Sequence, residues 1–256
     1  MGVRPDTATL GSLALLFWLV GGLSHSEEAF AEPVVQLAWH TCGSSGATDL
    51  VTESKGSDVF LVAWVEGQEA GHQGYSVTIE WKAAAGGSLP DAWRFDSEGC
   101  QPESLIRVDH LNPIPHTASC WTGLCGTSSF SRQSSMIYEP STGTARLSLE
   151  VLYPQGIPAG NPSLRYLLTR TTFFLSTFGR EGESEIGTCG GLEQPVCFRL
   201  VDARYQNLAG TWVPWTIGNS IVSVHGESVP APDCLAVPAR PSTWGRIKTQ
   251  YHSSRI

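Results

Sequence analysis

The sequence predicts an all-β protein, an antiparallel β-sandwich of the immunoglobulin-like or jelly-roll-like type that is fastened by disulfides. Residues 59–65 form an unbroken apolar run, typical of a strand buried on both faces, or nearly so. Apolar and polar residues alternate over residues 75–81, as in a strand with one buried and one solvent-exposed face. The apolar side carries Tyr75, Val77, Ile79 and Trp81. Burying these four side chains stabilises by about 6–12 kcal/mol, whereas ordering seven backbone positions costs about 7–14 kcal/mol. This central pair therefore needs a second apolar layer.

The remaining segments carry short strand signals separated by turn residues, as a sandwich requires. Strands are expected at residues 34–39, 105–109, 145–153, 164–178 and 196–205, with a last hairpin-like pair at 212–215 and 217–224. Residues 49–57 are polar and predict a loop or an edge strand. Residues 117–135 are rich in Ser and Gly, and residues 154–162 predict a Pro/Gly connector. The pattern therefore favours many short strands over long helices.

The N-terminal residues predict a targeting signal. Arg4 precedes an apolar stretch at residues 10–23, and Ala29-Phe30-Ala31 offers a small-x-small cleavage site. This order is typical of a secretory signal peptide over residues 1–31. The alternative is an uncleaved anchor, although the stretch is shorter than the ~20 residues of a spanning helix. Cleavage leaves a sandwich at residues 32–237, as one body or as two packed subdomains that divide near residues 154–163, with no stable membrane span.

Seven cysteines follow the predicted signal: Cys42, Cys100, Cys120, Cys125, Cys189, Cys197 and Cys234. In an exported protein such cysteines are expected to form disulfides. None forms a C-x-x-C pair or lies at zinc-finger spacing from histidines, which argues against a structural zinc site. Short loops favour Cys120–Cys125 and Cys189–Cys197, Cys42–Cys100 is the expected long-range bridge, and the odd thiol is assigned to Cys234.

The C-terminal residues 238–256 differ in character from the rest. Ser242 or Thr243 can cap a short helix, and three side chains then share one face: Trp244, Ile247 and Tyr251. A helix of about nine residues is not stable alone in water, so it has to dock. It docks either on its own sandwich or, as a basic sorting or attachment tail, on envelope machinery.

Two segments carry a resemblance. Residues 90–96 are Pro-Asp-Ala-Trp-Arg-Phe-Asp, followed by Gly99-Cys100, and residues 242–248 are Ser-Thr-Trp-Gly-Arg-Ile-Lys. With the segment Pro195-Val196-Cys197-Phe198, they resemble motifs of uncharacterised secreted bacterial proteins, which tend to end near an aromatic-basic terminus, whereas this chain continues past Tyr251. The resemblance implies secretion and this architecture, and it brings no activity. The absence of an Asn-x-Ser/Thr site, with Asn161 followed by Pro162, is consistent with a bacterial source.

The sequence predicts no catalytic residue and no cofactor. Residues 43–46 fail the G-x-S-x-G spacing of a nucleophile elbow, and nothing pairs the acidic residues as glycoside hydrolysis needs. Asp109, His110 and His116 are close in sequence and are candidate metal ligands, with surface or structural histidines as the plainer alternative. The net charge is −8 and the Lys and Arg residues are scattered, so the sequence predicts no basic surface of the kind that binds nucleic acid.

Tryptophans are the candidate ligand-binding residues. Exposed rings stack on sugars or anchor interfaces, and Trp121, Trp212 and Trp215 are the candidates, with core packing as the alternative. We therefore expect a secreted or cell-surface protein with a binding or structural role and no catalytic activity. Its expected partner is a glycan or another envelope protein. The alternative is a secreted carbohydrate-active hydrolase or a carbohydrate-binding module.

Overall fold

The computed structural model describes residues 32–40, 42, 47–52, 58–67, 71–96, 106–109, 131–157, 164–175 and 189–235, all within one compact unit that spans residues 31–256. The strands are β1 (Val34–Trp39), β2 (Asp49–Thr52), β3 (Val59–Glu66), β4 (His72–Ala83), β5 (Ile106–Asp109), β6 (Ser131–Glu139), β7 (Thr144–Ile157), β8 (Arg165–Phe173), β9 (Val196–Asn207), β10 (Trp212–Pro214), β11 (Thr216–Ile217) and β12 (Ile221–Gly226). Asp91–Trp93 is a single turn of 3-10 helix. No helix in this part of the chain is long and apolar enough to cross a membrane.

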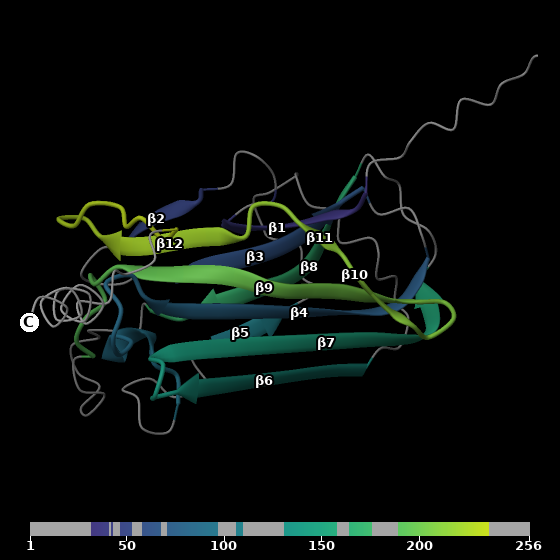
Figure 1. Cartoon of the computed structure of the whole chain (residues 1–256), viewed down its shortest axis with the longest axis horizontal. Helices are drawn as coiled ribbons and strands as arrows, with labels where there is room; N and C mark the ends of the chain where they lie inside the picture. Colours follow the sequence, from purple (N-terminus) through teal and green to yellow (C-terminus); the bar gives the residue numbers. More distant parts are fainter. Residues whose placement is uncertain are drawn as a thin grey trace, which may run out of the picture. The chain divides into compact units, whose positions relative to one another are not determined.

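Two sheets form the predicted sandwich (Figure 1). The five-stranded sheet has the order β11-β1-β3-β8-β5, and the seven-stranded sheet has the order β2-β12-β9-β4-β7-β6 with β10 beside β9. Neighbouring strands are antiparallel except β1–β11 and β2–β12, which are parallel. The all-β, disulfide-bonded sandwich is therefore confirmed, with two short parallel pairs at the rims.

Strand β3 is buried on both faces, as its unbroken apolar run predicts. Its inward residues join the main core, while Val62 and Trp64 join a second cluster with Cys42 and Leu167. Strand β4 has the predicted alternation, and Tyr75, Val77, Ile79 and Trp81 are all at most 2% exposed. The pairing of these two strands is wrong, however, because β3 belongs to the smaller sheet and β4 to the larger one. They face each other as the two apolar layers instead.

Aromatic rings fill the core around Phe198 of β9. Its ring lies 5.1 Å from Trp39, 5.7 Å from Trp81 and 5.6 Å from Phe173, centroid to centroid. Such edge-to-face and stacked contacts add to the stabilisation that buried area provides. The ring of Trp93, from the 3-10 turn, lies 5.5 Å from Phe198. The Asp-Ala-Trp-Arg-Phe-Asp segment therefore supplies the core with aromatic side chains.

Two local expectations are wrong, and one strand was not expected. The hairpin at 212–224 does not form, because β10 pairs with β9, β11 with β1, and β12 with β9 and β2. The connector at 154–162 begins inside β7, where the register with β4 slips and Gly156 takes a φ of 72°. The Ser/Gly-rich segment 117–135 ends in the first half of β6, which β7 holds as a strand. The predicted tail helix with Trp244, Ile247 and Tyr251 lies outside the described residues.

Candidate functional site

A cleft of about 520 Å³ opens between the last strands of the two sheets, β5 and β6. Its apolar lining includes Met136, Leu147 and Phe174, and its polar lining includes Arg107, Arg132 and Ser134. Arg132 bridges the two sheets, because its Nη1 donates a 2.6 Å hydrogen bond to the carbonyl oxygen of Val108 on β5. A guanidinium has five donors, so this bond leaves Arg132 able to contact a ligand as well.

Asp109, a candidate metal ligand, lies at this cleft and is clamped by arginines. Its carboxylate lies 2.9 Å from Nε of Arg107 and 3.1 Å from Nη2 of Arg170. The side chain is only 12% exposed. A cation at this carboxylate would meet two guanidinium groups, so the structure does not support Asp109 as a metal ligand. His110 and His116 lie outside the described residues, and within those residues no three His, Cys, Asp or Glu side chains could hold a metal ion.

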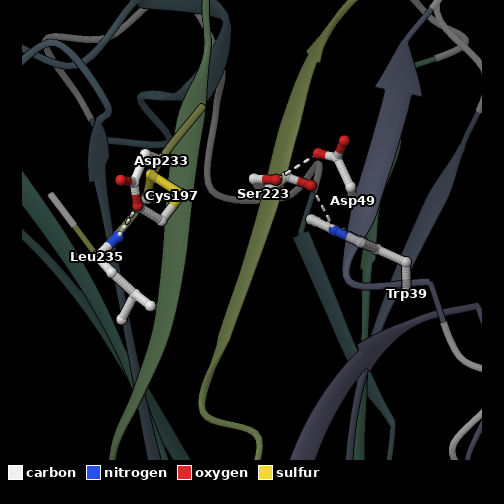
Figure 2. Close-up of a disulfide and its surroundings, with 7 residues drawn as sticks. Trp39, Asp49, Cys197, Ser223, Asp233 and Leu235 are labelled. Atoms are coloured by element: carbon white, nitrogen blue, oxygen red, sulfur yellow. Dashed lines mark hydrogen bonds between the residues drawn. A yellow bond between two sulfur atoms is a disulfide. The ribbon is translucent and has the colours of Figure 1, made fainter. Parts of the chain in front are cut away.

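A second polar group lies at the opposite rim of the larger sheet, on β2 and β12. Ser223 and His225 are two residues apart on β12, so both point to the same face. Asp49 is the direct neighbour of Ser223 on β2. The Ser223 hydroxyl donates to Oδ1 of Asp49, and Nε2 of His225 lies 3.0 Å from Oδ2 (Figure 2 shows the serine bond). The sequence gives no local signal for this group, because 174 residues separate Asp49 from Ser223.

This group has the three residue types of a hydrolase triad in the wrong order. A catalytic triad places the imidazole between the hydroxyl and the carboxylate, so that it can take the hydroxyl proton. Here the carboxylate of Asp49 is central, and the hydroxyl of Ser223 donates to it directly. Ser223 is also only 7% exposed. The arrangement therefore fastens β2 to β12 and does not activate a nucleophile.

Both ring nitrogens of His225 face acceptors. Nδ1 lies 2.8 Å from the carbonyl oxygen of Gly226, and Nε2 faces the Asp49 carboxylate. Burial lowers the pKa of His225, but the hydrogen bonds to Gly226 and Asp49, together with the charge of Asp49, outweigh it and leave the pKa raised. Only the protonated ring can donate to both partners, so this contact is strongest in the acidic range.

A disulfide joins Cys197 of β9 to Cys234, with their Cα atoms 5.6 Å apart (Figure 2). The predicted Cys189–Cys197 bridge and the assignment of Cys234 as the odd thiol are therefore wrong. Cys197 is the register neighbour of Ser223 on β12, so the bridge lies beside the Asp49 group. Cys42 and Cys189 are disulfide-bonded too. Cys100, Cys120 and Cys125, and with them the Cys42–Cys100 and Cys120–Cys125 predictions, lie outside the described residues.

A groove of about 520 Å³ runs beside this disulfide. Its lining combines Asp49 and the start of β12 with Pro232, Asp233 and Leu235. Oδ1 of Asp233 accepts a 3.1 Å hydrogen bond from the backbone N–H of Leu235, which fixes the turn after the disulfide (Figure 2). The groove therefore depends on the Cys197–Cys234 bridge for its outer wall.

The tryptophans do not form the expected platform. Trp215 is 5% exposed and stacks on Tyr205 with centroids 5.4 Å apart, so it belongs to the core. Trp212 is half-buried on β10, and Trp121 lies outside the described residues. Stacking on a sugar needs an open ring face. The structure therefore offers no platform built from Trp212 and Trp215.

No family model matches the chain, and no curated protein matches it. Among solved structures, a non-cellulosomal cohesin from the hyperthermophilic archaeon Archaeoglobus fulgidus is similar at 11% identity and a TM-score of 0.38, over 77% of this chain and 94% of that chain. A type II cohesin module of the ScaA scaffoldin of Acetivibrio cellulolyticus is similar at 10% identity and a TM-score of 0.39, over 84% of this chain and 98% of that chain. Similarity at this level says nothing about a ligand.

Proposed function

We propose that this chain is a secreted or cell-surface binding module without catalytic activity, and that its ligand enters the cleft between β5 and β6. The observation that supports this most concerns two carboxylates, one with a side chain that is 12% exposed and the other with a side chain that is 36% exposed. Asp109 is held by two arginines, and Asp49 is held by a serine and a histidine. Each carboxylate is already paired with neighbouring side chains by ion pairs or hydrogen bonds, whereas a general base has to reach a substrate proton.

The cleft itself has the features of a binding site. Its volume lies in the range of small-ligand sites, which combine an apolar surface with a few placed polar groups. Met136 and Leu147 provide the apolar surface of the cleft. The two positive charges of Arg107 and Arg132 exceed the one negative charge of Asp109. On a chain of net charge −8, this local positive excess favours a ligand that carries an anionic group. Export rests on the predicted signal at residues 1–31 and is supported by the disulfides.

The hydrolase alternative has one location to consider. Glu193 and Glu227 line a smaller hollow of about 230 Å³ together with Thr52 and Ser228. Both glutamates are exposed. A glycosidase needs one of its two carboxyl groups to stay protonated, which burial usually achieves. This hollow therefore supports the alternative less well than the cleft supports binding.

Two assays on the oxidised protein test the proposal. We expect no hydrolysis of a polysaccharide and ester panel by the wild type. Turnover that Glu193→Gln or Asp49→Asn abolishes would establish an enzyme. In parallel, glycan and acidic-peptide arrays should yield a ligand that Arg132→Ala weakens at least tenfold. Arg146→Ala is the matched control, because Arg146 is an exposed arginine on β7 that pairs with Glu80 away from the cleft. Equal loss in both variants would place the ligand elsewhere.

A further inference from the structure

The edge strands of the two sheets differ greatly in length. In the described residues, the smaller sheet ends at β11 and β5, with two and four residues, and the larger sheet ends at β2 and β6, with four and nine residues. An exposed strand edge can pair with another chain, and short edge strands are one protection against this. The three-residue β10, which pairs with β9 alone, is short as well, so β6 is the one long edge strand among the described residues.

The other protections are missing from β6 as well. Its register with β7 runs without a slip from Ser131 to Glu139, so no bulge twists it away. It contains no proline, and its two charged residues, Arg132 and Glu139, lie near its ends. All nine residues are exposed or half-buried, and Ile137 is 62% exposed. By contrast, the carbonyl of Val108 on the neighbouring edge β5 is occupied by Arg132.

The sequence of β6 matches itself in one antiparallel register. A two-fold axis perpendicular to the sheet places the inward-facing residues of one copy opposite the inward-facing residues of the other. The axis therefore lies midway between the two copies of one residue of β6. With the axis at Ser135, all nine residues pair: Ser131 with Glu139, Arg132 with Tyr138, Gln133 with Ile137, Ser134 with Met136, and Ser135 with itself. No like charges are opposed, and Arg132 meets an aromatic ring. About eight to ten main-chain hydrogen bonds form.

We infer that β6 pairs with β6 of a second copy of this chain, in this register, and joins the two larger sheets into one continuous sheet. The contact is narrow compared with a stable interface, so the dimer is weak and depends on concentration. The pairing uses the main chain of β6, and its tests measure the dimer rather than a bound ligand, although Arg132 and Ser135 also line the cleft. This inference therefore stands or falls separately from the proposed function.

Cross-linking through introduced cysteines tests the register. Ser135→Cys places two thiols opposite each other, with Cβ atoms about 4.5–5.5 Å apart, and should give a covalent dimer under mild oxidation or with a short thiol cross-linker. Ser131→Cys is the matched control on the same exposed face. Its two thiols are eight residues out of register, about 27 Å apart, and should give no more dimer than the wild type with its seven native cysteines. Equal yields from both variants overturn the register.

Charge variants test the same contact without covalent trapping. Ser135→Lys opposes two lysines at the axis and should raise the dimer dissociation constant about two- to fivefold, whereas Ser131→Lys opposes Glu139 and should not raise it. Both variants change the net charge equally and replace an exposed serine, so neither is expected to affect folding. Sedimentation across a concentration series reads the dissociation constant. A monomeric wild type over the whole soluble range overturns the inference.

Discussion

The two sides of the sandwich are built in opposite ways. On the side of β2 and β12, the indole Nε1 of Trp39 crosses from the smaller sheet to donate a 2.7 Å hydrogen bond to the carbonyl of Ser223, and a disulfide and the Asp49 group lie next to it. On the side of β5 and β6, the bond from Arg132 to Val108 joins the outermost strands of the two sheets, and a cleft lies beneath it. We therefore expect the β2–β12 rim to contribute more to stability than the β5–β6 rim, where the proposed ligand and second copy bind.

The largest effect is expected from removing the disulfide. The double variant Cys197→Ala/Cys234→Ala opens a loop with a sequence separation of 37 residues, which should lower the free energy of unfolding by about 4 kcal/mol. Urea unfolding of the wild type and the double variant measures this. A loss below about 1 kcal/mol would mean that the bridge does not hold the β2 side together.

A smaller loss is expected from Trp39→Phe. The substitution removes the hydrogen bond from Nε1 to the carbonyl of Ser223, which should cost about 0.5–1.5 kcal/mol beyond the lost ring volume. Trp93→Phe is the control, since both indoles are fully buried and Nε1 of Trp93 makes no hydrogen bond within the described residues. If denaturant titration gives the two variants equal losses, the Trp39 bond contributes nothing.

On the open side, Arg132→Ala should cost about 1 kcal/mol, because one charged hydrogen bond between half-exposed strands is lost. Arg146→Ala removes an exposed ion pair with Glu80 and should cost about 0.2–1 kcal/mol. Thermal unfolding of both variants orders the effects. A loss for Arg132→Ala as large as that of the disulfide variant would contradict the contrast between the two sides.

The smallest effect is a pH dependence from His225. Its pKa is raised in the folded state, so its contribution to stability is fully present below the unfolded pKa of about 6.5 and is lost as the pH rises through the folded pKa. The unfolding free energy of the wild type should therefore decline from mildly acidic to mildly alkaline pH. Asp49→Asn should flatten this decline because it removes the charge that His225 faces. Identical pH slopes in the two proteins would show that the contact between His225 and Asp49 does not cause the pH dependence.

Local patterns predicted strands well and their partners poorly. The alternation at 75–81 and the apolar run at 59–65 report how many faces of a strand are buried, and both predictions are confirmed. Neither pattern carries information about which strand lies alongside, so the assignment of β3 and β4 to different sheets could not be read from them. Strand β6 was missed because Ser and Gln hide the period of two, and pairing with β7 holds it in place.

The candidate site was harder to predict for the same reason. Asp49 and His225 are brought together only by the parallel pairing of β2 with β12. Chain entropy favours the short Cys189–Cys197 loop, but the direction in which each strand points its cysteine side chains decides which sulfur atoms meet. Cys197 lies between inward-facing Val196 and Phe198, so it faces outward to Cys234. Asp109 was correctly noticed as a special carboxylate, but its arginine partners could not be seen in the sequence.

The bridge between Cys197 and Cys234 also sets the path of a mechanical load. Strands β10, β11 and β12 lie inside the covalent loop that it closes. A pull on the chain beyond Cys234 passes through the two sulfur atoms to the start of β9 and bypasses these three strands. Because β9 lies between β12 and β4, the force is shared by neighbours on both flanks. In the reduced protein the same pull acts first on β12, which lies between β2 and β9, so the disulfide moves the point of loading from β12 to β9.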